Sequence, residues 1–135
     1  MKYGYFKIVN YQVVSKGALG YYYEKMKTIP NIKVYYDHCG KKRPFLYKVL
    51  KKISTGDSLY VLNIYNLGAK PSTIFEILEM LKKEDIKFFI KDKEISLDKV
   101  FDQIEKMRTY NREHLNSKIY DSDILEAVLQ KLEKY

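Results

Sequence analysis

Apolar and polar positions along this chain follow the period of strands and the period of helices in alternation. Four short segments have the pattern of strands: Tyr3–Val9, Ile32–Tyr36, Leu59–Ile64 and Ile86–Ile90. The first alternates apolar residues with polar or small ones, whereas the third is almost continuously apolar. A continuous apolar strand is typical of a parallel sheet that is covered on both faces.

Segments with helical spacing separate these strands. We expect one helix over Gly17–Lys27, a second over Pro44–Ile53 and a third from Pro71, whose buried stripe is Ile74, Ile77, Leu78 and Leu81. Gly56-Asp57 breaks the second helix before the third strand. The alternating order predicts an α/β fold with a mainly parallel sheet of four strands, or slightly more, and helices on both faces.

The pattern becomes purely helical after the fourth strand. A long helix is expected over about Leu97–Lys118, and a short helix follows over Ser122–Lys134, with Asp121 or Ser122 as its N-cap. We expect residues 1–118 to form one domain that includes the long helix, and residues 119–135 to form a helical tail. The tail has an apolar stripe that packs on its own domain, on a second copy or on a partner: Ile124, Leu125, Val128, Leu129 and Leu132.

Composition adds a positive charge to this picture. The 135 residues carry a net charge of +8 with a pI near 9.3, and such a field attracts phosphate backbones. Apolar residues make up 46% of the chain, which excludes disorder, and no apolar run is long enough to span a membrane. A lone cysteine, Cys39, and an N-terminus without a signal-peptide pattern favour the cytoplasm.

Short motifs occur in an order that is known from one family of enzymes. They are GYFKIV over Gly4–Val9, the turn Asp37–Gly40, Arg43-Pro44, Gly56-Asp57, IYNLGA over Ile64–Ala69 and NREHLNSKI over Asn111–Ile119. In order and spacing this set resembles the catalytic domain of the serine recombinases, the resolvases and invertases. The resemblance covers about residues 1–118 and implies a resolvase-like sheet followed by the long helix.

The same resemblance implies that the chemistry of the family is missing. In that family a serine at the end of the first strand attacks a DNA phosphate, and arginines stabilise the developing charge. Here the serine position falls on Val9, or on Asn10 after a one-residue shift, and neither side chain is a nucleophile. Arg43 alone is clearly retained, and the further degenerate positions are Lys7, Tyr65, Asn66 and Ala69. We therefore expect no catalytic residue and no strand transfer.

The resemblance also implies partners. In recombinases the long helix builds the dimer, and the stripe Val100, Ile104 and Met107 suits the same use here. The family's helix-turn-helix module has no counterpart in the short tail, so DNA contact requires the catalytic-domain surface and the long helix. The candidate phosphate contacts are Lys7, Arg43 and Lys70 at the former active site and Lys106, Arg108, Arg112 and Lys118 on the long helix.

Other kinds of site find less support in the residues. His38-Cys39 offers two metal ligands without a matching second pair, so no metal and no cofactor is expected. Tyr21, Tyr22 and Tyr23 are consecutive on a helix, so some of them must be buried and some exposed. This arrangement argues against a shared stacking platform for nucleic-acid bases.

Two classes of function remain open. The first is a catalytically inactive, recombinase-like domain that oligomerises and associates with DNA, or modulates an active recombinase in a mobile element. It predicts a contiguous basic stripe of Arg108, Arg112 and Lys118. The alternative is a protein-interaction module without DNA function, which predicts an exposed apolar patch around Leu125, Val128 and Leu129. An active recombinase with relocated catalytic groups is a third hypothesis.

Overall fold

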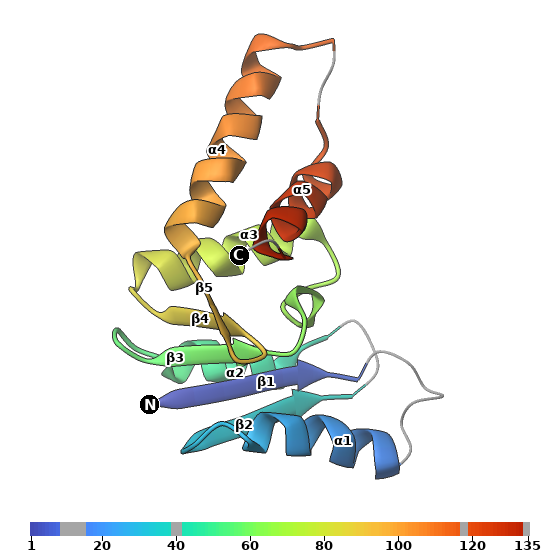
Figure 1. Cartoon of the computed structure of the whole chain (residues 1–135), viewed down its shortest axis with the longest axis vertical. Helices are drawn as coiled ribbons and strands as arrows, with labels where there is room; N and C mark the ends of the chain where they lie inside the picture. The colour runs from blue at the N-terminus through green and yellow to red at the C-terminus, as the bar shows by residue number, and fades with distance from the viewer. Residues whose placement is uncertain (9–15, 39–41, 117–118, 134–135) are drawn as a thin grey trace.

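The computed structural model describes residues 1–8, 16–38, 42–116 and 119–133, which form an α/β fold. Its five-stranded sheet has the order β2-β1-β3-β4-β5, in which β1 to β4 are parallel and β5 is antiparallel to β4 (Figure 1). The strands are β1 (Lys2–Lys7), β2 (Ile32–Asp37), β3 (Ser58–Val61), β4 (Lys87–Ile90) and β5 (Lys93–Ile95). The mainly parallel sheet expected from the sequence is confirmed.

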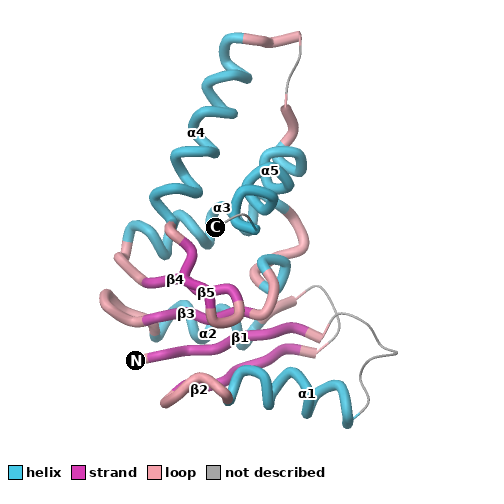
Figure 2. The backbone as a smooth tube through the Cα atoms, viewed as in Figure 1, coloured by secondary structure: helices cyan, strands magenta, loops and turns pink. Residues whose placement is uncertain are grey.

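Helices cover both faces of this sheet, as expected (Figure 2). On one face lies α1 (Lys16–Lys27), and on the other lie α2 (Pro44–Lys52) and α3 (Pro71–Lys83). A 3₁₀ turn, η2 (Ile64–Asn66), connects β3 with α3. After β5 the chain leaves the sheet as α4 (Leu97–Glu113) and returns as α5 (Asp121–Glu133), which packs on α3 and α4.

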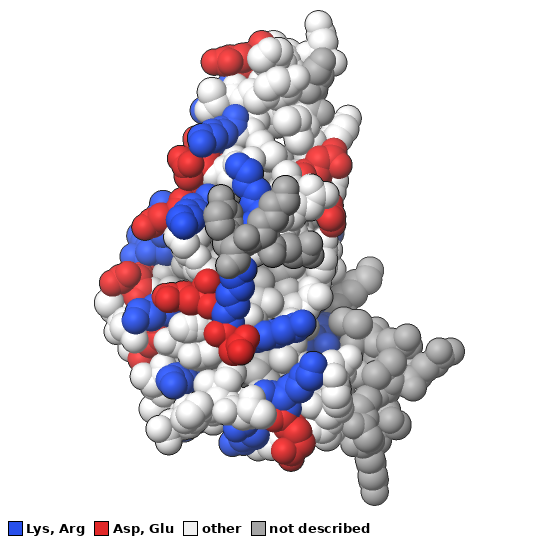
Figure 3. All heavy atoms as spheres, viewed as in Figure 1, with Lys and Arg blue, Asp and Glu red and all other residues white. Residues whose placement is uncertain are grey.

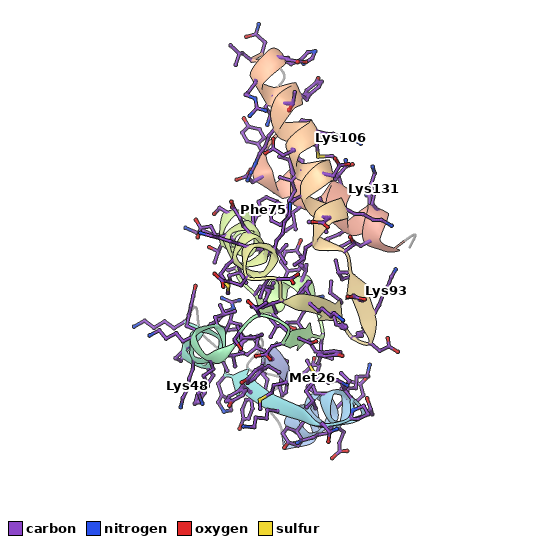
Figure 4. All side chains as sticks on the ribbon, turned by 90° about the vertical axis from the view of Figure 1, so that its left-hand side faces the viewer. Met26, Lys48, Phe75, Lys93, Lys106 and Lys131 are labelled. Carbon is purple, nitrogen blue, oxygen red and sulfur yellow. The ribbon has the colours of Figure 1, made fainter. Side chains whose placement is uncertain are left out.

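The face under α1 holds the smaller of two apolar clusters, in which Phe6, Met26, Ile32 and Tyr60 are buried. Gly4 allows the close approach of this helix to the sheet. A Cβ atom at this position would lie 2.8 Å from Ile32 Cδ1 and 3.1 Å from Met26 Sδ, which is labelled in Figure 4. The glycine of the Gly-Tyr motif is therefore explained by packing.

The opposite face holds the larger apolar cluster, which joins the sheet to α2, α3, α4 and α5. Leu59 and Val61 of β3 pack there with Ile74 and Leu78 of α3, which belong to the stripe predicted from the sequence. Leu125 of α5 is 1% exposed and belongs to the same cluster. Burial of one such side chain stabilises a fold by about 1.5–3 kcal/mol, so α5 is an integral part of this core.

Asn111 closes the connection between α4 and α5. Its Oδ1 accepts a hydrogen bond from the Ile119 N–H at 2.6 Å, and its Nδ2 donates to the Ile119 carbonyl at 2.7 Å. The chain reverses direction around this pair. For that reason α4 ends at Glu113 and not at Lys118, and α5 already includes Asp121, which was expected as a cap.

The apolar stripe that was expected to form a dimer lies inside the monomer. Val100 and Ile104 are buried, and Met107 packs against the same cluster as α5. The prediction that this stripe forms a dimer interface was therefore wrong, because the domain's own helices cover it. The alternative hypothesis predicted an exposed apolar patch on the last helix. This prediction was also wrong, since Leu125 and Val128 are buried.

Smaller differences concern the ends of strands. β5 was not expected, because a strand of three residues carries no recognisable period. The third strand ends at Val61 and not at Ile64, since the chain turns into η2. Gly56 has a φ of 90°, which confirms the expected break before β3. Val9, the expected end of the first strand, lies outside the described residues.

Within the described ranges, no helix combines the length and the apolar character needed to cross a membrane.

Candidate nucleic-acid interface

The carboxyl ends of β1 and β2 meet the start of α2. Asp37, at the end of β2, is buried and accepts hydrogen bonds from the Tyr5 hydroxyl at 2.8 Å and from the N–H groups of Phe45 and Leu46 at 3.3 Å. Asp37 therefore caps the N-terminus of α2 through these two N–H groups. The N-cap residue itself, Arg43, makes no side-chain cap hydrogen bond. Burial, reinforced by the hydrogen bond to Asp37, raises the pKa of the Tyr5 hydroxyl.

Lys7 ends β1 beneath the segment that leads into α2. Its side chain is buried, and Nζ donates a hydrogen bond to the Lys42 carbonyl at 3.0 Å. A buried ammonium needs such partners, because desolvation of an unpaired charge is costly. This candidate phosphate contact therefore lies in the interior, where it holds the backbone before α2.

Arg43, the one arginine that the resemblance retains, connects α2 to η2. Nε donates to the Asn66 carbonyl at 3.0 Å, and Nη2 donates to the Tyr65 carbonyl at 3.3 Å. Only 9% of the residue is exposed. The guanidinium group therefore helps to hold two parts of the fold together, and its charge lies just below the surface.

Two asparagines close the turn at η2. Oδ1 of Asn66 accepts hydrogen bonds from the N–H groups of Leu62 at 3.2 Å and Asn63 at 2.9 Å. In return, Oδ1 of Asn63 accepts one from the Tyr65 N–H at 2.8 Å. This reciprocal capping box satisfies the backbone donors that follow β3.

Tyr65 connects η2 to the C-terminal helix. Its hydroxyl donates a hydrogen bond to Glu126 Oε1 at 3.0 Å. Desolvation, followed by the hydrogen bond to Glu126, raises the pKa of this hydroxyl. Tyr65 and Asn66 thus have structural contacts at positions where the resemblance implies catalytic residues. The nucleophile position, Val9, lies outside the described residues.

A groove of about 600 Å³ opens between the starts of α2 and α3. Lys70 is the N-cap residue of α3, which has no side-chain cap, so the partial positive charge of this helix end borders the groove. Lys70 and Ala69, both named from the sequence, therefore lie at one site with Arg43. The groove is lined by Lys42, Arg43, Tyr47, Ala69, Lys70 and Thr73, among others.

The outer side of α2 continues this positive surface. Phe45 and Tyr47 are 46% and 48% exposed, and Lys48, Lys51 and Lys52 are exposed beside them. We call these five residues the α2 face. Lys48 points away from the sheet in Figure 4, and its Nζ lies 5.8 Å from the centre of the Phe45 ring.

No carboxylate along this part of the chain balances the charge of the α2 face. Residues 38–56 include no Asp or Glu, although they hold Lys41, Lys42, Arg43, Lys48, Lys51 and Lys52. Among the described side chains, the three lysines of the α2 face form no ion pair. Sequence reasoning missed these lysines, and the run without acidic residues is the signal that could have identified them.

The candidate cations of α4 have carboxylate partners instead. Lys106 pairs with Asp102 at 3.3 Å, and Glu105 lies 3.9 Å from Arg108 and 3.8 Å from Arg112. Figure 3 shows positive and negative side chains interleaved along the edge that carries α4. Glu105 therefore lies beside Arg108 and Arg112 of the expected basic stripe and offsets part of their charge. Paired surface charges attract phosphate less than unpaired ones.

A second groove, of about 510 Å³, lies between β5, α4 and α5. Lys93, Lys106 and Lys131 line it and are labelled in Figure 4. Lys93 Nζ donates to the Leu132 carbonyl at 2.7 Å, and Lys131 Nζ donates to Gln103 Oε1 at 2.5 Å. These lysines serve contacts within the protein. The last candidate cation, Lys118, lies outside the described residues.

The sequence also offered one pair of candidate metal ligands, His38-Cys39. The part of the chain that the structure describes has no group of three or more His, Cys, Asp or Glu residues able to hold a metal ion. His38 packs edge-on against Tyr36, and Cys39 lies outside the described residues.

No protein-family model matches this chain, and no curated protein matches it. The α2 face and the groove beside it are therefore the candidate site among the described residues.

Proposed function

We propose that this chain is a non-catalytic domain of the serine-recombinase type that associates with the phosphate backbone of DNA. The α2 face and the groove beside it form the contact surface. The observation that carries this proposal is the cluster of exposed lysines on α2 that form no ion pair. Each phosphate that such a lysine neutralises releases condensed counterions, which favours binding at low salt.

Absence of strand transfer is part of the proposal. Val9 and Asn10 supply no hydroxyl nucleophile, and loss of the nucleophile alone costs about a millionfold in rate. Arg43 already donates to two main-chain carbonyls, and Asn66 carries no charge. These contacts support a domain that keeps the frame of the family without its reaction.

Assembly is the second part of the proposal. The domain self-associates through its long helix and modulates an active recombinase of a mobile element through mixed oligomers. Because Val100 and Ile104 are buried, this interface has to use the distal part of α4. Burial of Leu125 and Val128 removes the apolar patch that the alternative, a protein-interaction module without DNA function, requires.

Fluorescence anisotropy of a labelled duplex, titrated at several salt concentrations, tests the DNA contact. Binding by the native chain should weaken with salt, with a log–log slope of about −0.9 per neutralised phosphate. The triple variant Lys48→Gln, Lys51→Gln, Lys52→Gln should reduce the steepness of this slope by about 2 to 3, if each lysine contacts one phosphate.

A matched control removes the same number of charges from α4. The triple variant Lys106→Gln, Arg108→Gln, Arg112→Gln should change the slope little, because these cations pair with Asp102 and Glu105. Equal effects of the two triple variants would contradict the assignment to α2. No binding at low salt would contradict the DNA contact itself.

A second experiment addresses the chemistry. The protein is incubated with supercoiled plasmid and with linear duplex, and the products are separated under denaturing conditions. We expect neither cleavage nor a protein–DNA adduct, since Val9 and Asn10, at the serine position that the resemblance implies, are not nucleophiles. An adduct that survives denaturation would reveal relocated catalytic groups and would overturn the non-catalytic assignment.

A further inference from the structure

The α2 face carries two exposed aromatic rings, and binding to a DNA duplex would give these rings no role. Phe45 and Tyr47 are each nearly half exposed, while α2 packs on the sheet through Leu46 and Val49. Neither ring belongs to the apolar clusters of the core. The bases of a duplex are stacked inside it, so these rings have access only to bases that are unpaired.

We propose that the α2 face binds single-stranded nucleic acid, with bases stacked on Phe45 and Tyr47 and phosphates bound by the neighbouring lysines. This inference rests on the proposed function and names its ligand. Lys48 follows Phe45 by three positions, and Lys51 follows Tyr47 by four. Because residues at these spacings are neighbours on a helix surface, each ring has a cation beside it.

Stacking on an aromatic ring needs only the flat face of a base and therefore tolerates any sequence. Lysines that alternate with such rings supply the salt-dependent contact to the backbone. The groove extends the surface beyond α2, because Tyr47 lines it together with Lys42 and Lys70. A strand that passes over Tyr47 therefore reaches two further lysines at the starts of α2 and α3.

An anionic membrane would attract the same lysines, but the geometry fits it less well. Leu46 and Val49 anchor α2 to the sheet, so the large exposed apolar side chains of this helix are the rings of Phe45 and Tyr47. A flat membrane surface also leaves the groove of about 600 Å³ unused. A single strand, in contrast, is narrow enough to enter a groove between two helix ends.

The variant Phe45→Trp reports stacking directly, because the chain contains no tryptophan. When it is titrated with an oligothymidylate of about 12 nucleotides, the tryptophan emission should be quenched as a base stacks on the ring. A duplex of the same length should bind without this quenching. An oligouridylate of the same length then distinguishes RNA from DNA as the source of the strand.

The double variant Phe45→Leu, Tyr47→Leu tests the energetic contribution of the rings. Its affinity for the single strand should fall by at least about tenfold, while its affinity for the duplex should stay within about twofold. Tyr21→Leu is the matched control on α1, since Tyr21 is exposed and Lys25 Nζ lies 4.9 Å from its ring centre. This control should leave both affinities unchanged.

The outcomes separate this inference from the proposed function. If the duplex binds but the tryptophan is not quenched and the double variant binds single strands normally, the stacking inference is wrong and the DNA contact stands. If neither nucleic acid binds at low salt, both are wrong. Binding to phosphatidylserine vesicles in place of oligonucleotides would assign the α2 face to a membrane surface and overturn both.

Discussion

Asn66 accepts two main-chain hydrogen bonds at the position where the resemblance implies an arginine. An arginine side chain has donors and no acceptor, so it would leave the N–H groups of Leu62 and Asn63 without this partner. Tyr65 and Arg43 also direct their polar groups to other parts of the fold. Recombinase chemistry at this site would therefore require a rebuilt η2 turn as well as a serine.

The turn at η2 allows a test by single substitutions. Asn66→Ala should lower the free energy of unfolding by about 1–3 kcal/mol, because two partly buried N–H groups lose their acceptor. Asn63→Ala is the matched control, since it removes one exposed hydrogen bond and should cost less than about 1 kcal/mol. Urea denaturation measures both values. Equal losses would show that Asn66 does not hold the turn.

The buried hydroxyl of Tyr5 predicts a dependence of stability on pH. Its pKa is raised in the folded protein, first by burial and then by the bond to Asp37, whereas the unfolded chain titrates near pH 10. Below about pH 10 both states hold the proton, and above it the unfolded state loses the proton first. Stability should therefore fall above about pH 10, by about 1.4 kcal/mol per pH unit from this residue.

The variant Tyr5→Phe isolates this effect, because it removes the ionisable group and keeps the ring. Urea denaturation at several pH values between about 8 and 11 compares the two proteins. The difference in free energy of unfolding between the native chain and the variant should be constant up to about pH 10 and should shrink above it. Parallel curves for the two proteins would contradict the assignment.

At the scale of elements, α5 buries the apolar stripe of α4. Ile124, Leu125 and Val128 join the same cluster as Val100 and Ile104, so the two helices bury each other. Tyr65 adds a hydrogen bond from η2 to α5, and Asn111 holds the connection between the helices. A helix that looked like a separate tail is therefore part of the main core.

Docking of α5 predicts a large effect of a substitution near the C-terminus. Leu125→Ala should lower the free energy of unfolding by about 2–5 kcal/mol, as expected for a large-to-small change in a core. Leu115→Ala, at a position that is 83% exposed, should change it by less than about 0.5 kcal/mol. Chemical denaturation measures the difference, and equally small effects would mean that α5 is not docked.

Across the whole molecule, the net charge of +8 is unevenly distributed. Lys106 and Arg108 of α4 pair with carboxylates one turn away, and Arg112 pairs with Glu105 two turns away. The lysines of α2, in contrast, have no carboxylate between residues 38 and 56. The shape is uneven as well, because α4 extends beyond the rest of the fold (Figure 1). Charge and shape thus support a division within the proposal, with the nucleic-acid contact at α2 and assembly at the end of α4.

This division predicts where a dimer forms. Tyr110 and Leu115, near the end of α4, are 38% and 83% exposed and are available to a second copy. The double variant Tyr110→Asp, Leu115→Asp should convert a dimer into a monomer without loss of helix content. Sedimentation velocity and circular dichroism measure these two properties. A native chain that sediments as a monomer at every concentration would contradict the predicted dimer.

Much of the fold and part of the site could be predicted from local patterns. The four parallel strands and the helices between them are signalled by their apolar periods. Two charge pairs of α4, Lys106 with Asp102 and Arg108 with Glu105, can be predicted from spacings of four and three residues. The structural uses of Lys7, Arg43 and Tyr65 could not be predicted. Their partners come from distant parts of the chain, such as Glu126 for Tyr65.

The sequence by itself determined the type and order of the main elements and the positive charge, because period and composition are properties of neighbouring residues. It also contained the run of lysines without acidic residues that became the α2 face. Only the tertiary structure decided which apolar stripe was covered and which polar groups remained at the surface. Those outcomes depend on contacts such as α5 on α4 and Asp37 at the start of α2, which join residues that no local period connects.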